Sequence, residues 1–283
     1  MNRLYTEKLD IGYSERLIVE NLNLSIPEGK ITALVGANGS GKSTILKAMA
    51  RMMRPNGGKV FLDGKSIHQQ PTKEVAKQLA ILPQNPVAPD GLTVFELISY
   101  GRFPHQKGFG TLSKEDKEMI IWAIEVTGMR AFSDRPVDQL SGGQRQRAWI
   151  AMSLAQGTDM LFLDEPTTYL DMAHQLEVLQ LLQQLNEEQK RTIVMVVHDL
   201  NHATRYAQHM VAIRSGDIIS EGSPETVMTK DVLRAVFNIE ADIIADPRTG
   251  VPLCFPYELA REPKDKKSST IDCTQQEAAE ATA

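Results

Sequence analysis

The sequence reads Gly36-Ala37-Asn38-Gly39-Ser40-Gly41-Lys42-Ser43-Thr44 at residues 36–44. This run matches the pattern G-x-x-x-x-G-K-[ST], in which glycines let backbone N–H groups surround phosphate oxygens. In that pattern the lysine reaches the β and γ phosphates and the next hydroxyl binds Mg²⁺, which would be the roles of Lys42 and Ser43. We therefore expect this loop to bind a nucleoside triphosphate together with Mg²⁺.

The residues on either side of the loop agree with this interpretation. Residues 31–35 form a short apolar run that predicts a strand, and residues 43–53 have the spacing of a helix. Strand, loop and helix in this order are the context that a phosphate loop requires. Further apolar runs predict strands buried on both faces, at residues 59–62, 79–82, 160–163 and 193–197. With helices between them, these strands indicate a doubly wound α/β core.

A second glycine-containing stretch, Leu140-Ser141-Gly142-Gly143-Gln144, lies far downstream. It places Ser141, Gly142 and Gly143 just before a helical pattern that begins near Gln144, so free N–H groups and a positive helix end would face an anion. One nucleotide site needs only one phosphate loop. If the anion is the γ phosphate held by another copy of the chain, the active unit is a dimer with ATP at its interface.

Polar side chains follow three of the predicted strands. Asp164 and Glu165 end the run 160–163 in the form of a Walker B segment, whose Asp holds Mg²⁺. Glu165 would then face the attacking water as its general base. His198 ends the run 193–197 and could contact the γ phosphate, and Gln84 could reach both Mg²⁺ and water. The alternatives are a strand-end turn at Asp164 and a structural role for His198 before the next helix.

Residues 85–139 differ from the core, because residues 93–100 and 113–127 have helical periodicity. Ser113 and Asp116 form a capping box at the start of the second of these helices. We therefore expect three parts, namely an α/β core of residues 1–84 and 145–258, a helical subdomain of residues 85–144, and a polar, disordered tail of residues 259–283.

Composition excludes several classes of protein. The 31 Lys and Arg against 36 Asp and Glu give a net charge of −5 with no long basic run, which argues against a nucleic-acid partner. Two cysteines are too few for a disulfide framework or a zinc site. The chain begins without the apolar stretch of a signal peptide, and its apolar runs are strand-sized, so we expect no membrane span. Four scattered histidines read as surface or partner contacts rather than a metal cluster, namely His105, His174, His202 and His209.

The order and spacing of these motifs resemble those of ATP-binding cassette (ABC) proteins over about residues 4–237. The resemblance implies an ABC ATPase fold, which is an α/β, P-loop NTPase (RecA-like) core with an antiparallel β subdomain and an inserted helical subdomain. It also implies that two copies sandwich two ATP molecules and separate after hydrolysis.

The resemblance also implies a role for each motif residue. It makes Tyr13 the aromatic side chain that stacks on adenine, although Tyr13 could instead serve only in packing. It makes Asp171 the residue that communicates across the dimer. The residues that surround the phosphates are Gly36, Ala37, Asn38, Gly39, Ser40, Gly41, Lys42, Ser43 and Thr44, and those next to the metal are Ser43, Gln84 and Asp164. The catalytic side chains are Glu165, His198 and Gln84. The residues that cap the other subunit's ATP are Ser141, Gly142, Gly143 and Gln144.

Within the family, the chain is similar to free-standing ATPases that pair with separate membrane subunits. The segments 83–85, 93–94, 100–104, 167–171 and 246–252 look like those of iron-siderophore importers, with haem and cobalamin importers as close alternatives. This likeness implies an ATP hydrolase at the cytoplasmic face of the cell membrane, bound to two permease subunits and acting indirectly with a substrate-binding protein. The alternative from a different class is an ABC ATPase that acts on nucleic acid or ribosomes.

Overall fold

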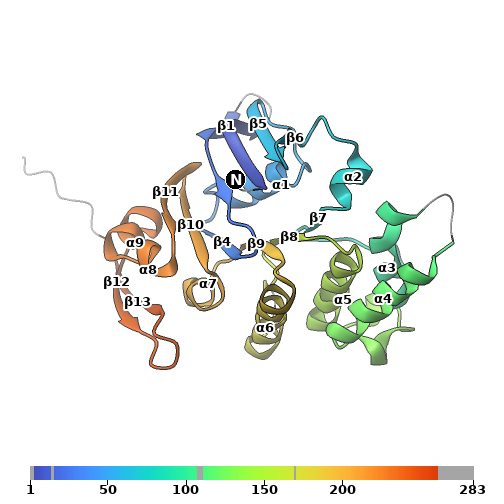
Figure 1. Cartoon of the computed structure of the whole chain (residues 1–283). Helices are drawn as coiled ribbons and strands as arrows, with labels where there is room; N and C mark the ends of the chain where they lie inside the picture. The colour runs from blue at the N-terminus through green and yellow to red at the C-terminus, as the bar shows by residue number, and fades with distance from the viewer. Residues whose placement is uncertain (1–2, 14–15, 107–110, 169, 261–283) are drawn as a thin grey trace, which may run out of the picture.

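A six-stranded sheet forms the centre of the molecule (Figure 1). The computed structural model describes residues 3–13, 16–106, 111–168 and 170–260. The strand order of the central sheet is β11-β10-β4-β9-β8-β7, with β11 antiparallel to its neighbour and the others parallel. Its strands are β4 (Ile31–Val35), β7 (Leu79–Leu82), β8 (Met160–Asp164), β9 (Thr192–Val196), β10 (His209–Arg214) and β11 (Asp217–Gly222). Every residue of β4, β8 and β9 is buried, which explains why these strands appear in the sequence as continuous apolar runs.

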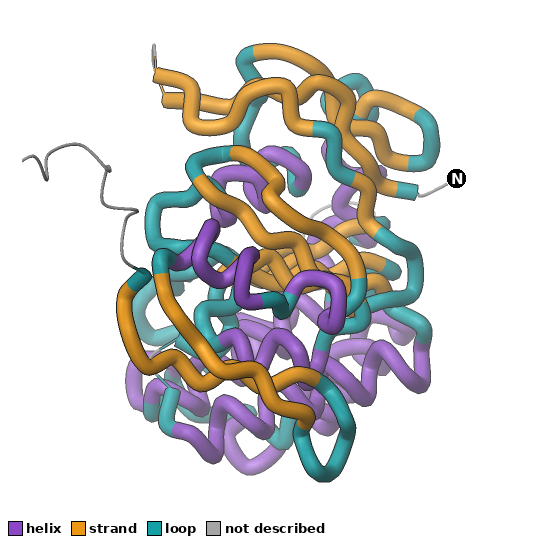
Figure 2. Tube along the Cα trace, turned by 90° about the vertical axis from the view of Figure 1, so that its left-hand side faces the viewer, coloured by secondary structure: helices purple, strands orange, loops and turns teal. Residues whose placement is uncertain are grey.

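An antiparallel sheet covers one face of the central sheet (Figure 2). Its strands are β1 (Leu4–Tyr13), β2 (Arg16–Leu22), β3 (Ser25–Ile26), β5 (Gly57–Leu62) and β6 (Lys65–Ser66). Helix α1 (Lys42–Met49) lies between the two sheets, where Ile45 and Leu46 pack with Ile11 of β1 and Phe162 of β8 in one hydrophobic cluster. The antiparallel β subdomain that the resemblance implies is therefore present.

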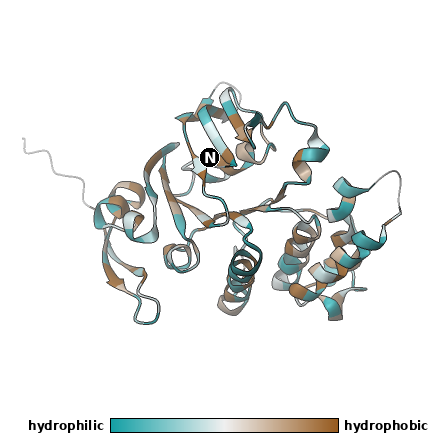
Figure 3. Cartoon of the chain, in the orientation of Figure 1, coloured by the Kyte–Doolittle hydropathy of each residue, from teal (hydrophilic) through white to brown (hydrophobic). Residues whose placement is uncertain are grey.

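Helices cover the other face of the central sheet. They are α5 (Gly142–Ala155), α6 (Met172–Gln189) and α7 (Leu200–Tyr206), while α3 (Val94–Ser99), η1 (Tyr100–His105) and α4 (Lys114–Val126) pack around α5. Hydrophobic and hydrophilic residues occupy different parts of these helices in Figure 3. In α4 the buried side is Ile120, Ala123 and Ile124, the spacing of one helix face. The division expected between residues 144 and 145 falls in the first turn of α5 and stays a prediction.

Short helices and a C-terminal hairpin complete the described chain. They are α2 (Thr72–Ala76), η2 (Arg130–Phe132), η3 (Val137–Gln139), α8 (Pro224–Val227), α9 (Lys230–Phe237), β12 (Ile239–Ala245) and β13 (Pro252–Leu259). The hairpin of β12 and β13 packs on α9 and α7. Residues 261–283, which hold most of the expected tail, lie outside the described residues. In the described part of the chain, no helix combines the length and the apolar character needed to cross a membrane.

Arg102 and Asp116 form a buried ion pair inside the helical layer. Arg102 Nε donates to Asp116 Oδ1 at 2.8 Å, and Arg102 Nη1 donates to the carbonyl oxygen of Ala155 at 2.9 Å. The two charged side chains are only 3% and 5% exposed. Asp116 also completes the expected capping box with Ser113, which is confirmed. One carboxylate therefore joins η1 to the first turn of α4.

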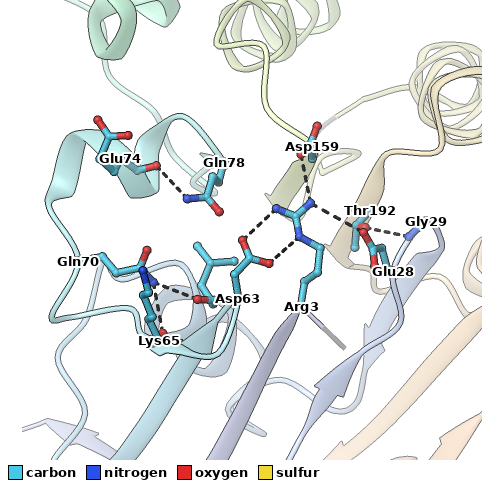
Figure 4. Close-up of polar contacts among 11 residues, drawn as sticks. Arg3, Glu28, Gly29, Asp63, Lys65, Gln70, Glu74, Gln78, Asp159 and Thr192 are labelled. Atoms are coloured by element: carbon cyan, nitrogen blue, oxygen red, sulfur yellow. Dashed lines mark hydrogen bonds and ion pairs between the residues drawn. The ribbon is translucent and has the colours of Figure 1, made fainter. Parts of the chain in front are cut away.

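Arg3 connects the antiparallel sheet to the central sheet (Figure 4). Its guanidinium donates twice to Asp63, at 2.8 and 3.1 Å, and once to Asp159 at 3.1 Å. Glu28 lies 3.8 Å from the same guanidinium. Asp63 lies in the turn between β5 and β6, and Asp159 directly precedes β8, so Arg3 fixes the edge where the two sheets meet.

Candidate active site

The phosphate loop follows β4 and has a conformation that requires glycine. Gly36, Gly39 and Gly41 have φ values of 156°, 76° and 102°. A Cβ at Gly36 would overlap the carbonyl oxygen of Ile213 and lie 2.7 Å from Ser40 Oγ. Gly41 is the N-cap of α1 and has no side chain to bond the first N–H groups of the helix. These N–H groups and the positive end of the helix dipole are therefore available to phosphate oxygens.

Lys42 is held inside the loop. Its Nζ donates to the carbonyl oxygens of Gly36 at 3.0 Å and of Ala37 at 2.9 Å, and the residue is only 5% exposed. Burial lowers the pKa of Lys42, while the negative charges of Glu165 and Asp164 oppose that change without cancelling it. Within the described residues no carboxylate lies in ion-pair contact with Lys42, so a bound phosphate would supply the compensating charge.

Ser43 and Asp164 come together at the end of β8 as a set of oxygen atoms suited to Mg²⁺. Ser43 Oγ donates to Asp164 Oδ1 at 2.6 Å. Asp164 Oδ2 is buried and has no hydrogen-bond partner among the described residues, and Lys47 Nζ, at 3.7 Å, is too distant for one. A buried carboxylate oxygen without a partner is costly, and Mg²⁺ prefers oxygen ligands. The residues present therefore fit the metal that the sequence predicts.

Glu165 and His198 face each other at the ends of adjacent strands. His198 Nε2 lies 2.7 Å from Glu165 Oε1, and Thr168 Oγ1 donates to Glu165 Oε2 at 2.9 Å. Burial raises the pKa of Glu165, but the hydrogen bonds from His198, Thr168 and Gln84 outweigh burial and bring that pKa below its ordinary value. Glu165 is thus ionised at neutral pH, so His198 Nε2 carries the proton that it shares with Glu165. The structure brings together the three side chains that the sequence picks as catalytic.

A cavity of about 180 Å³ lies over the phosphate loop. Its lining is Ile18, Asn38, Gly39, Gly41, Lys42, Ser43, Thr44, Glu165 and His198. A second cavity of about 460 Å³ adjoins it, because Ile18 and Gly39 line both, and its other lining residues are Tyr13, Arg16, Leu17 and Ser215. Tyr13 is 55% exposed on that wall, as a side chain that stacks on a base needs to be. Adenine stacking on Tyr13 stays a prediction.

The second glycine-containing stretch is the start of α5. Ser141 is the N-cap, and it exchanges a capping box with Gln144, at 3.3 Å from Gln144 N to Ser141 Oγ and 3.1 Å from Ser141 N to Gln144 Oε1. Residues 140–144 do not line either cavity, whose described walls come from elsewhere in the chain. The chain does not bring this stretch to its own phosphate loop, as the dimer hypothesis requires.

Asp171 is the N-cap of α6 and lies on the surface, 66% exposed. Its Oδ1 accepts from His174 N at 2.9 Å and pairs with His174 Nδ1 at 2.8 Å. Like residues 140–144, Asp171 does not line either cavity of the described chain. Its role across a dimer stays a prediction.

Four residues at the site are absent from the set picked from the sequence. Lys47 is one helical turn beyond Ser43, and Thr168 is three residues beyond Glu165, so both spacings could have indicated proximity. Ile18 lines both cavities from β2, a strand that the sequence did not predict. His174 reads as a scattered surface residue because no local pattern shows that the first turns of α5 and α6 meet.

Comparisons with known proteins agree with this geometry. A family model described as ABC transporter matches residues 19–168. The iron(3+)-hydroxamate import ATP-binding protein FhuC of Bacillus subtilis (strain 168) is 61% identical over 265 residues, covering 94% of this chain and 98% of that protein.

Solved structures give the same relationship. A metal-chelate type ABC transporter in an inward-facing conformation superposes with a TM-score of 0.78 and 27% identity, over 91% of this chain and 98% of that one. The ATP-binding cassette MJ0796, in a dimeric post-hydrolysis state bound to ADP and Pi, superposes with a TM-score of 0.68 and 28% sequence identity. The match covers 78% of this chain and 98% of that one.

The fold, the phosphate loop with its facing carboxylates, and the similarity along the chain thus agree. The resemblance first stated from the motifs is confirmed. The chain belongs to the ABC transporter family, as an ATP-binding cassette that hydrolyses ATP.

Proposed function

We propose that this chain is the ATPase subunit of an importer that takes up a ferric siderophore. It works as a dimer at the cytoplasmic face of the cell membrane, bound to two separate permease subunits. The observation that carries the ATPase part of the proposal is the contact of Glu165 with His198, at 2.7 Å, on the wall of the cavity over the phosphate loop. A carboxylate base that faces a phosphate cradle supports hydrolysis of the γ phosphate.

The chemistry follows from the groups around that cavity. Lys42 and the N–H groups of the loop bind the phosphates of ATP, and His198 transfers its hydrogen bond from Glu165 to a γ-phosphate oxygen. This transfer frees Glu165 Oε1 to accept a proton from water as the water oxygen attacks the γ phosphorus and ADP leaves. Mg²⁺ bound by Ser43 and Asp164 would neutralise charge on the β and γ phosphates.

The dimer is supported by the residues that lie away from the cavity of their own chain. Ser141 and Gly142 are exposed at the positive end of α5, and Asp171 is exposed at the start of α6. A second copy related by a twofold axis would bring these residues over the phosphate loop of the first. Two equivalent ATP sites then form between the two chains.

The permease subunits are assigned to the helical layer near Gln84. Three large hydrophobic side chains are exposed there, with Val87 at 88%, Tyr100 at 54% and Phe103 at 74%. Val87 also lines a cavity of about 230 Å³, whose other lining residues are Pro86, Ala88, Pro89, Asp90, Val137, Asp138, Arg145 and Trp149. Exposed apolar groups around a hollow suit a protein partner, and Gln84 connects this surface to Glu165.

The cargo is inferred from likeness. The 61% identity to an iron(3+)-hydroxamate import protein supports a hydroxamate siderophore carrying Fe³⁺. The cargo itself contacts other subunits, so the cavities of this chain do not select it.

Uptake of ⁵⁵Fe by cells that lack this chain tests the proposal. We expect uptake from a ferric hydroxamate siderophore to be lost, restored by the wild-type chain, and not restored by Glu165→Gln. Uptake of haem and cobalamin, measured in parallel, should be unchanged. Normal ⁵⁵Fe uptake without the chain, or loss confined to haem or cobalamin, would contradict the siderophore assignment and leave the ATPase assignment intact.

A further inference from the structure

The first turns of α5 and α6 touch through one glycine and one imidazole. A Cβ built on Gly143 would lie 2.8 Å from His174 Cδ2, 3.0 Å from Cγ and 3.3 Å from Nε2. Real Cβ atoms are not found at the first of these distances, so the ring of His174 occupies the space that a side chain at position 143 would need. The backbone of Gly143 therefore packs directly against the ring of His174.

Asp171 fixes the orientation of that ring. Hydrogen bonds from the backbone and the ring of His174 lower the pKa of Asp171, so its carboxylate is ionised and can only accept. His174 Nδ1 must therefore carry a proton and donate it to Asp171 Oδ1 at 2.8 Å. With Nδ1 directed at Asp171, the Cδ2–Nε2 edge of the ring is turned toward Gly143.

Two further polar contacts connect the same two segments. Gln146 Nε2, in α5, donates to the carbonyl oxygen of Pro166 at 2.9 Å. Arg147 Nη1, also in α5, pairs with Glu177 of α6 at 2.9 Å. The start of α5 is thus attached to the chain on both sides of Asp171.

We propose that His174 is a positioning residue that holds the stretch 140–144 and Asp171 in one fixed arrangement, so that both reach the ATP of the partner chain together. This inference rests on the proposed ATP-sandwich dimer. Binding groups placed on separate flexible turns would each have to be ordered when the dimer closes. An imidazole clamped between a carboxylate and a glycine supplies that order in advance.

His174 is not needed to keep α6 folded. Leu179, Leu182 and Leu185 bury the helix against the central sheet, each 1% exposed or less. A change at His174, which is 33% exposed, therefore alters the position of the first turn without removing the hydrophobic anchor. This separation allows a positioning role to be told apart from a folding role.

The test uses His174→Ala in the Glu165→Gln chain, which should form lasting dimers with ATP because it hydrolyses ATP slowly. We expect a fluorescent ATP analogue to bind the separate chain within about twofold of the parent, because His174 does not line the cavity. Dimerisation with Mg²⁺ and ATP should weaken roughly 10-fold or more, as misplaced binding groups do. His174→Asn retains an N–H at the position of Nδ1 and should recover part of the loss.

His202→Ala is the matched control. His202 occupies the same place in α7, with its backbone N–H bonded to Asp199 Oδ1 at 2.9 Å, but its ring lies against Tyr206. It should dimerise like the parent.

Unchanged dimerisation of His174→Ala would overturn the inference, and so would an equal loss of monomer ATP binding and thermal stability. Failure of the parent Glu165→Gln chain to dimerise with ATP would instead overturn the proposed sandwich, and the inference with it.

Discussion

At Glu165, burial and hydrogen bonding act on the same carboxylate in opposite directions. Burial alone would raise the pKa of Glu165, and the hydrogen bonds from His198, Thr168 and Gln84 outweigh it and bring that pKa below its ordinary value. In the proposed mechanism Glu165 is the base, and the 2.7 Å contact with His198 would hold it in place until ATP binds. Glu165 has a φ of 56°, a left-handed conformation that directs the side chain at the end of β8.

Glu165→Gln keeps the shape of this side chain and removes its basicity. We expect ATP hydrolysis to fall roughly 10²-fold or more, the usual contribution of a general base. Binding of ATP should be retained, because Lys42 and the loop N–H groups are unchanged. Phosphate release and binding of a fluorescent ATP analogue, measured side by side, check both parts, and normal turnover would remove Glu165 from the role of base.

Thr168→Val tests the hydrogen bond that helps to ionise Glu165. Thr168 Oγ1 lowers the pKa of Glu165, so its loss should raise that pKa. Since the base works only when deprotonated, the acidic limb of the hydrolysis rate should move to higher pH in Thr168→Val. Thr167→Val, one residue away, serves as the control and should keep the wild-type profile. Identical acidic limbs for all three chains would show that Thr168 does not tune Glu165.

At the scale of secondary structure, the sequence predicted best where strands are buried on both faces. The strand predicted at residues 79–82 is confirmed residue for residue as β7. A parallel sheet is covered on both faces, so its strands appear in the sequence as uninterrupted apolar runs. The predicted helix 43–53 is wrong at its end. Helix α1 stops at Met49, and Arg51 adopts a left-handed φ of 63°, although apolar spacing continues beyond it.

The elements that the sequence missed have weaker patterns. Strands β1 and β2 alternate buried and exposed residues irregularly around a β-bulge, which removes the regular period of two. Helix α6 buries a row of leucines but is otherwise rich in Gln and Glu, so its apolar stripe is narrow. Both depend on tertiary contacts more than on local preference.

The pair of Arg102 and Asp116 is a buried ion pair inside the helical layer. Asp116→Ala leaves Arg102 buried without its partner, and we expect a loss of about 3–5 kcal/mol in the free energy of unfolding. Glu125→Ala, which removes the exposed pair with Arg130, should cost no more than about 1 kcal/mol. Urea unfolding of both variants measures the two losses, and equal unfolding midpoints would contradict the larger loss expected for Asp116→Ala.

The same pair predicts an acid sensitivity. Burial raises the pKa of Asp116, but the bonds from Arg102 and Ser113 outweigh it and hold that pKa below its ordinary value. A carboxylate with a lowered pKa stabilises the fold above its unfolded pKa, about 3.9 for Asp. This contribution should be lost as pH falls below that value, and Asp116→Ala should lack that part of the acid dependence.

Across the whole molecule, the sequence could predict residues that one chain brings together but not how two chains meet. Asp164 ends a parallel strand, and Glu165, His198 and Gln84 follow parallel strands. The carboxyl ends of these strands share one edge of the sheet, so the proximity of the four residues could be inferred from their order alone. The contact of His174 with Gly143 joins two helix starts far apart in sequence, and no local pattern reports it. The only hint in the sequence that the stretch 140–144 meets another copy is that the chain has two phosphate-binding motifs where one nucleotide site needs one.

In the proposed dimer, each ATP lies between the phosphate loop of one chain and the stretch 140–144 of the other. The most direct test is to mix two inactive chains, Lys42→Ala and Ser141→Arg, and to measure ATP hydrolysis. Each homodimer has two defective sites, whereas the mixed dimer has one site with an intact loop and an intact Ser141. We expect the mixture to regain about a quarter of wild-type activity, since half of randomly paired dimers are mixed and each has one good site of two. Activity no higher than that of the separate variants would contradict the two-chain site.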